Sequence, residues 1–152
     1  MTGVLVAGIG NRDRGDDAIG PIIAERLAPL VPGGVRVIER AGDMSGLLDD
    51  WAGFDSVVLV DAAGIMSLAG TVHRIDLASE DVPNGLSPRS THALGVADTV
   101  ALARALGLLP RWIILYVIEA ESFEVGTPVT PAVLSAAGDV ILRILDDIQR
   151  PA

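Results

Sequence analysis

Hydrophobic and polar positions along the chain divide it into short apolar runs and longer segments with helical spacing. Four apolar runs are typical of buried strands, at 4–9, 35–39, 55–62 and 112–118. Helical periodicity and helix-start or helix-stop residues predict four helices, over 18–30, 46–51, 91–106 and 131–149. Residues 71–77 are predicted to form an edge strand, because their alternation is poor and charges fall on both faces.

Strands that alternate with helices predict right-handed crossovers and a parallel sheet that is covered on both faces. We therefore expect a three-layer α/β/α sandwich with a mainly parallel, five-stranded twisted sheet. The length of 152 residues fits one domain over 1–152, and no repeat, low-complexity tract or linker indicates a second one.

Composition and charge exclude several classes of function. Twenty acidic and 11 basic side chains give a net charge of -9, and no basic cluster offers a footprint for nucleic acid. Cysteine is absent, so a metal would have to be held by His, Asp or Glu. The first residues lack the basic segment and the apolar core that are typical of a signal peptide. The apolar run at 112–118 is far shorter than the roughly 20 residues that span a bilayer. We expect a soluble cytoplasmic protein without membrane or nucleic-acid partners.

The first strand runs into a glycine-rich acidic loop that leads to the first helix. Gly8 and Gly10 allow the backbone to turn, and the loop brings Asp16 and Asp17 to the start of the helix, which suits a cation better than a phosphate. If the strand order is 2-1-3, Asp61 at the end of the third strand faces the same crevice. The alternative is structural: Asp16 and Asp17 would cap the helix, and Asp61 would cap a turn.

Only two histidines are available as imidazole ligands. His92 is predicted in the first turn of a helix, where the helix dipole lowers its pKa and favours the neutral, metal-binding form. The alternative, which the residues alone favour, is an exposed histidine without a ligand role. His73, on the edge strand, is expected to be solvated. Asp43, Glu119 and Glu121 reach the same edge of the sheet and either line the crevice or are solvated.

The sequence indicates neither a dinucleotide-binding site nor the catalytic site of a serine hydrolase. The segment GIGNRDRG lacks the GxGxxG spacing of a dinucleotide site, and its arginines are offset by aspartates. A Ser-His-Asp hydrolase would need a GxSxG nucleophile elbow, which the chain lacks.

Four blocks of the chain resemble the hydrogenase maturation endopeptidases of peptidase family M52. They are LVAGIGNRDRGDDAIG at 5–20, VLVDA at 58–62, STHALGVADTV at 90–100 and ESFEVGTPVTPAV at 121–133. The resemblance implies a phosphorylase/hydrolase-like fold and an aspartic-type endopeptidase. Such an enzyme removes the C-terminal extension from the large-subunit precursor of a nickel–iron hydrogenase after nickel has been inserted, and so activates it.

The resemblance also implies the site residues. Asp17, Asp61 and His92 take the positions of the nickel ligands and catalytic residues, with Asp17 where relatives have Glu. The nickel would be carried by the substrate, with no permanent cofactor, and would either polarise the reacting groups or position the peptide while a carboxylate acts as general base. Gly42 and Asp43 fall in the loop implied to recognise the substrate. That loop often contains DGGT in relatives but reads ERAGDMSGLLDD at 39–50, so the class of hydrogenase stays open.

Two other functions remain compatible with the residues. One is a non-catalytic metal- or nucleotide-binding module on the same frame. The other is a peptidase of the same fold with another substrate.

Overall fold

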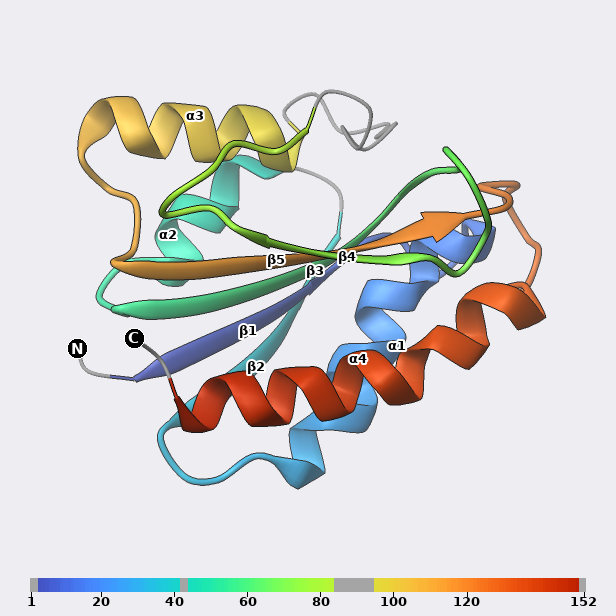
Figure 1. Cartoon of the computed structure of the whole chain (residues 1–152), viewed down its shortest axis with the longest axis horizontal. Helices are drawn as coiled ribbons and strands as arrows, with labels where there is room; N and C mark the ends of the chain where they lie inside the picture. Colours follow the sequence, from blue (N-terminus) through green and yellow to red (C-terminus); the bar gives the residue numbers. More distant parts are fainter. Residues whose placement is uncertain (1–2, 42–43, 84–94, 151–152) are drawn as a thin grey trace.

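One five-stranded sheet organises the protein, with the strand order β2-β1-β3-β5-β4 (Figure 1). The computed structural model describes residues 3–41, 44–83 and 95–150. The strands are β1 (Val4–Ile9), β2 (Val35–Arg40), β3 (Ser56–Gly64), β4 (Val72–Asp76) and β5 (Trp112–Ala120). All neighbours are parallel except the edge strand β4, which is antiparallel to β5. The predicted mainly parallel sheet, its 2-1-3 start and its edge strand are confirmed.

Helices cover both faces of the sheet. The α-helices are α1 (Ile19–Leu27), α2 (Leu47–Trp51), α3 (Val96–Leu106) and α4 (Pro131–Gln149), and the short 3-10 helices are η1 (Gly15–Ala18), η2 (Ala28–Leu30) and η3 (Met44–Gly46). In Figure 1, α1 and α4 lie below the sheet and α2 and α3 above it, which confirms the predicted three layers. None of the described helices is long and apolar enough to cross a bilayer.

Alternation along the central strands builds the two cores. In β3, Val58 and Val60 belong to the cluster that contains the buried side chains of α1 and α4. Val57 and Leu59 belong to the cluster on the opposite face, with residues of α2 and α3. Successive strand residues point to opposite faces, so a strand that is buried on both sides reads as one apolar run.

The observed element boundaries differ from the predicted ones, most of all in the segment 15–30, in β3 and β5, and at the start of α3. Residues 15–30 form η1, α1 and η2 in succession rather than one helix. Both β3 and β5 extend two residues further than expected, because the pairing continues to Gly64 and Ala120. α3 begins at Val96 rather than at residue 91, because Gly95 has extended dihedral angles. The predicted position of His92 lies outside the described residues.

Candidate active site

The candidate site lies at the carboxyl ends of β1 and β3, where the strand order of the sheet reverses. Asp17 lies on η1, which follows β1, and Asp61 lies in β3, three residues before that strand ends. The charge of Asp17 raises the pKa of Asp61, so the two carboxylates are close enough to interact. The predicted convergence of these two residues on one edge of the sheet is present in the structure.

Three glycines allow the first loop and α1 to approach the sheet this closely. A Cβ atom on Gly8 would lie 2.2 Å from the carbonyl oxygen of Gly20, and a Cβ atom on Gly20 would lie 2.8 Å from that of Val60. At Gly10 the φ angle is +146°, and an added Cβ atom would lie only 1.9 Å from the carbonyl oxygen of Asp17. A side chain at Gly10 would therefore displace the backbone that carries Asp17.

Asp17 is buried, with 6% of its surface exposed, and its Oδ2 accepts a hydrogen bond of 2.8 Å from the backbone N–H of Asn11. This bond holds the carboxylate against the loop that leaves β1. Neither η1 nor α1 has a side-chain hydrogen bond from its N-cap residue, and Asp17 lies in the first turn of η1, where its charge also favours the helix dipole.

Asp61 is 4% exposed and lies inside β3, on the face that carries α2 and α3. Burial raises the pKa of this carboxyl well above its usual value, and the negative charge of Asp17 raises it further. The N–H of Ala62 donates to Oδ1 over 2.8 Å and opposes this effect. The alternative of a strand-end cap before Gly64 is not observed, because the strand continues past Asp61.

The two carboxylates form a pair of oxygen donors that has no cationic partner among the described residues. Within the described residues, no ion pair includes Asp17 or Asp61. Two buried carboxylates repel each other, and a divalent cation between them would relieve that repulsion and lower the pKa of Asp61. The donor set therefore fits a hard or borderline metal ion.

The third predicted ligand and the predicted recognition residues lie outside the described residues. These are His92, Gly42 and Asp43, and their roles stay predictions. In the part of the chain that the structure describes, no group of three His, Asp or Glu side chains is arranged to hold a metal. Of the three implied ligands, the structure describes Asp17 and Asp61.

Asp16, the chain neighbour of Asp17, has a different role. It is fully buried, and its carboxylate accepts hydrogen bonds from the backbone N–H groups of Glu121 at 2.8 Å, Ser122 at 3.1 Å and Thr130 at 2.7 Å. The hydroxyl of Thr130 also donates to it at 2.9 Å. Asp16 thus ties η1 to the segment between β5 and α4, which leaves Asp17 as the acidic residue of this loop that pairs with Asp61.

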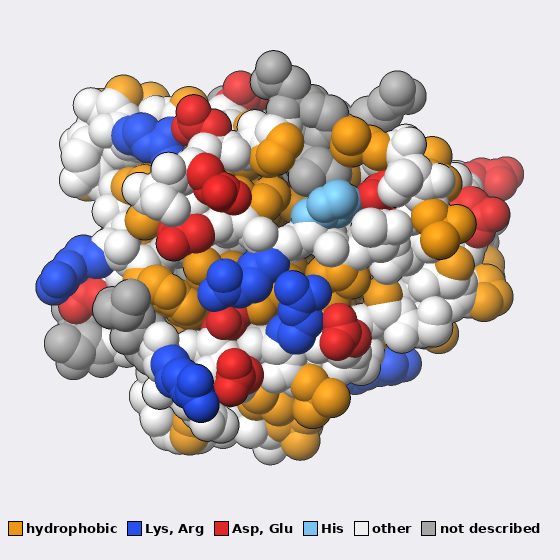
Figure 2. Space-filling view, in the orientation of Figure 1, with side chains coloured by type: hydrophobic (Ala, Val, Ile, Leu, Met, Phe, Trp, Pro, Cys, Tyr) orange, Lys and Arg blue, Asp and Glu red, His pale blue; other side chains and the backbone are white. Residues whose placement is uncertain are grey.

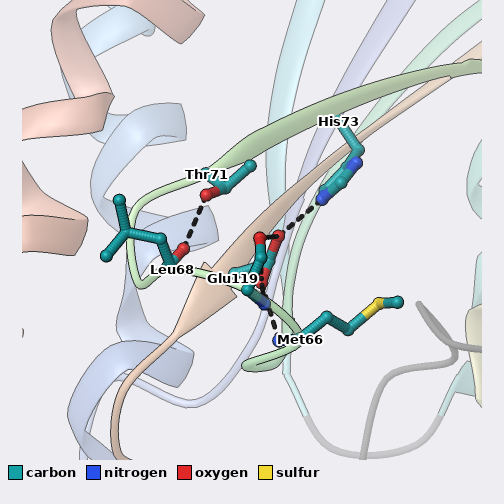
Figure 3. A network of polar contacts seen from close by, with 6 residues as sticks. Met66, Leu68, Thr71, His73 and Glu119 are labelled. Carbon is teal, nitrogen blue, oxygen red and sulfur yellow. Dashed lines mark hydrogen bonds and ion pairs between the residues drawn. The ribbon is translucent and has the colours of Figure 1, made fainter.

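Glu119 and His73 form a second polar group on the same face of the sheet (Figure 3). Glu119 is fully buried, and its carboxylate lies 2.8 Å from Nε2 of His73. It also accepts from the N–H groups of Met66 at 2.7 Å and Ser67 at 2.8 Å. Burial raises the pKa of Glu119, but the hydrogen bonds from Ser67, His73 and Met66 outweigh it and lower the pKa to about 2.

Sequence reasoning did not predict the contact between these two residues. The expectation of a solvated His73 is wrong, because its side chain is only 31% exposed and is bonded to Glu119. Asp61 and His73 both pair with Val117 of β5, one from each side. Since neighbouring strands are about 4.8 Å apart, His73 lies in the same row as Asp61 at roughly 10 Å. Only the position of the charged Glu119 directly after an apolar run could have indicated a buried carboxylate.

Comparisons with known proteins agree on one family. The family model HycI, hydrogenase maturation protease, matches residues 23–147. The hydrogenase 2 maturation protease of Escherichia coli (strain K12) is 33% identical over 149 residues, and the alignment covers 93% of this chain and 88% of that protein.

Solved structures of two similar proteins have the same fold. The hydrogenase-maturating endopeptidase HybD from E. coli superposes with a TM-score of 0.79 at 27% identity, over 97% of this chain and 92% of that one. The hydrogenase maturation protease HycI from Thermococcus kodakarensis KOD1 superposes with a TM-score of 0.76 at 25% identity, over 97% and 92%.

Proposed function

Since this chain belongs to the hydrogenase maturation protease family and is therefore a peptidase, we propose that it is a nickel-directed endopeptidase. It removes the C-terminal extension from the large-subunit precursor of a nickel–iron hydrogenase. The observation that supports this most directly is the buried pair of carboxylates, Asp17 and Asp61, at the carboxyl edge of the sheet.

The pair offers the precursor two carboxylates that are held in place before it binds. Asp17 is fixed by the N–H of Asn11, and Asp61 by the N–H of Ala62 and by its strand. Nickel in the precursor would bind to these oxygens, with His92 as the third proposed ligand, and this binding would report that the subunit is loaded. The enzyme needs no cofactor of its own in this scheme, and the reaction takes place in the cytoplasm.

The reaction is a peptide hydrolysis. The oxygen of a water attacks the scissile carbonyl carbon, the C–N bond breaks, and a proton from the water passes to the leaving amine. The carboxylate pair contributes by taking up the proton of the attacking water or by positioning the nickel-bearing peptide beside it. Burial and the charge of Asp17 raise the pKa of Asp61, which makes this carboxylate a stronger base than an exposed aspartate.

The test is cleavage of a purified precursor, followed by mass spectrometry. The parent protein should remove the C-terminal extension from the nickel-loaded precursor and leave the nickel-free precursor intact. Asp17→Asn, Asp61→Asn and His92→Ala should each reduce the rate roughly 100-fold or more, since each removes a charge or donor that acts on the reacting groups. Asp13→Asn, an exposed change in the same loop, is the matched control.

Two results would contradict the proposal in different ways. Equal cleavage of loaded and nickel-free precursor would show a peptidase that does not depend on nickel. An intact loaded precursor, together with tight calorimetric binding of free nickel or ATP by the protein, would identify a non-catalytic binding module.

A further inference from the structure

A small cavity lies beside the candidate site, between the loop that follows β3 and the segment that follows β5. Its volume is about 250 Å³, and it is lined by Gly64, Ile65, Ala120, Glu121, Ser122 and Phe123. Pockets for whole small-molecule ligands measure about 300–1,000 Å³, so this cavity suits a single side chain better than a complete ligand.

A buried carboxylate fixes the first wall. Glu119 accepts hydrogen bonds from the backbone of Met66 and Ser67, which directly follow Ile65. Figure 3 shows Glu119 lying between His73 and the loop at Met66. The loop is therefore held in one conformation although its apolar side chains point outward.

A second buried carboxylate fixes the other wall. Asp16 accepts from the N–H groups of Glu121 and Ser122, and its own N–H donates to the carbonyl oxygen of Ser122 at 2.9 Å. The guanidinium of Arg14 lies 5.9 Å from the centre of the Phe123 ring, a cation–π distance. The loop that bears Asp17 is thus in direct contact with this wall.

Both walls continue into the candidate site. Asp16 precedes Asp17, and Gly64 follows Asp61 by three residues of the same strand. At about 3.3 Å per residue, the cavity lies roughly 10 Å from Asp61. An extended polypeptide with its scissile bond at the carboxylates would place a side chain two to four residues away in this cavity.

The rim of the cavity is unusually apolar for a surface loop. Ile65 is 53% exposed, Met66 57% and Leu68 70%. Figure 2 shows apolar side chains at the surface on the right of the view, where Figure 1 draws the loops after β3 and β5. Exposed apolar groups clustered beside a cleft are typical of a surface that binds a partner.

We propose that this cavity is a specificity subsite, which receives an apolar side chain of the precursor two to four residues from the bond that is cut. The inference rests on the proposed endopeptidase function. Ile65 is the specificity-determining residue, and Asp16 and Glu119 are positioning residues that hold the two walls. Glu121 is the single ionisable residue of the lining, and its carboxylate disfavours an acidic side chain in the cavity.

The experiment measures kcat and KM for the nickel-loaded, full-length precursor with the parent enzyme and with Ile65→Asp. The variant should raise KM roughly tenfold or more, because it places a charge where an apolar side chain is buried, and should leave kcat within about threefold. Leu142→Asp is the matched control: Leu142 is 69% exposed on α4, and this variant should leave both constants unchanged.

A second set of measurements uses precursors that carry a single Asp at each of the four residues on either side of the cleaved bond. The parent enzyme should discriminate against Asp at one position by roughly tenfold or more in kcat/KM. Ile65→Lys should reduce this discrimination at the same position, because its positive charge can pair with the Asp of the substrate. Unfolding of the variant would lower its activity and could not improve cleavage of the Asp-containing precursor.

The outcomes separate the two proposals. A parent enzyme that never cuts the loaded precursor overturns the endopeptidase function and the subsite with it. An active Ile65→Asp enzyme with the KM of the parent overturns the subsite alone. The subsite is also overturned if, at the substrate position where cleavage changes with the Ile65 substitution, the parent enzyme prefers a basic over an apolar side chain.

Discussion

Asp16 and Asp17 are adjacent in the chain, but their carboxylates serve different parts of the molecule. Asp16 accepts hydrogen bonds from three backbone N–H groups between residues 121 and 130. Asp17 is bonded to its own loop and raises the pKa of Asp61. Asp16 joins the loop after β1 to the segment after β5, and Asp17 contributes to the proposed chemistry.

At the same scale, Gly10→Ala tests whether the loop backbone positions Asp17. The added Cβ atom would lie 1.9 Å from the carbonyl oxygen of Asp17, at a φ angle that L-residues avoid. We expect the free energy of unfolding to fall by about 2 kcal/mol or more, and cleavage of the precursor to fall with it. Urea denaturation and the cleavage assay measure the two effects.

Gly33→Ala is the control, because a Cβ atom there meets nothing within 4 Å. Equal stability and activity of the Gly10 and Gly33 variants would contradict this account of the loop.

At the scale of elements, buried carboxylates hold the loops after β3 and β5 in place. Glu119, at the end of β5, binds the backbone of the loop after β3 and the imidazole of His73 on β4. Three elements therefore meet at one side chain, which lies on the same face of the sheet as Asp61.

This arrangement predicts a defined pH dependence of stability. Since the pKa of Glu119 is lowered from 4.5 to about 2, its ionised form stabilises the fold above about pH 4.5, and this contribution is lost as the pH falls towards 2. Glu119→Gln should lower the free energy of unfolding by about 2 kcal/mol or more at pH 7, because it removes charge-assisted hydrogen bonds. The difference from the parent should shrink as the pH approaches 2.

Urea denaturation at several pH values between 2 and 7 measures this effect, with the exposed Glu80→Gln as control. A difference between parent and Glu119→Gln that stays constant down to pH 2 would show that the charge of Glu119 does not stabilise the fold.

At the scale of the whole molecule, the sheet separates a scaffold core from the face that bears the site. The core against α1 and α4 consists of aliphatic side chains together with Trp112 and Tyr116, whereas Asp61, Glu119 and His73 all lie on the α2 and α3 face. A substitution in the core against α1 and α4 should therefore lower the free energy of unfolding without a comparable loss of catalytic rate.

Ile144→Ala tests this separation. Ile144 is fully buried, and its truncation should lower the free energy of unfolding by about 2–5 kcal/mol. Ile144 lies 14 positions after Thr130, which is roughly 21 Å along α4 from the end of the helix that Asp16 contacts. The value of kcat per folded molecule should therefore not change. Leu142→Ala, at 69% exposure, should change stability by less than about 0.5 kcal/mol. A large loss of kcat in folded Ile144→Ala would show that the two faces are coupled.

Much of the fold could be predicted from the sequence, because strand and helix periods are local. The apolar runs at 4–9 and 112–118 coincide with β1 and most of β5, and Pro131 begins α4 as expected. The strand ends were misplaced where Glu119 interrupts the apolar pattern, since its burial depends on partners in another loop. The start of α3 was misplaced because an extended Gly95 leaves no distinctive pattern in the sequence.

By itself the sequence determined the order of the elements, the parallel α/β class and the approach of the loop with Asp16 and Asp17 to Asp61, because residues at the ends of neighbouring parallel strands reach one edge of the sheet. Only the tertiary structure decided which acidic residues are structural. Asp16 binds Thr130 across 114 positions of the chain, and Glu119 binds His73 across 46. Such bonds depend on which segments the fold brings together, and no local pattern of residues encodes that choice.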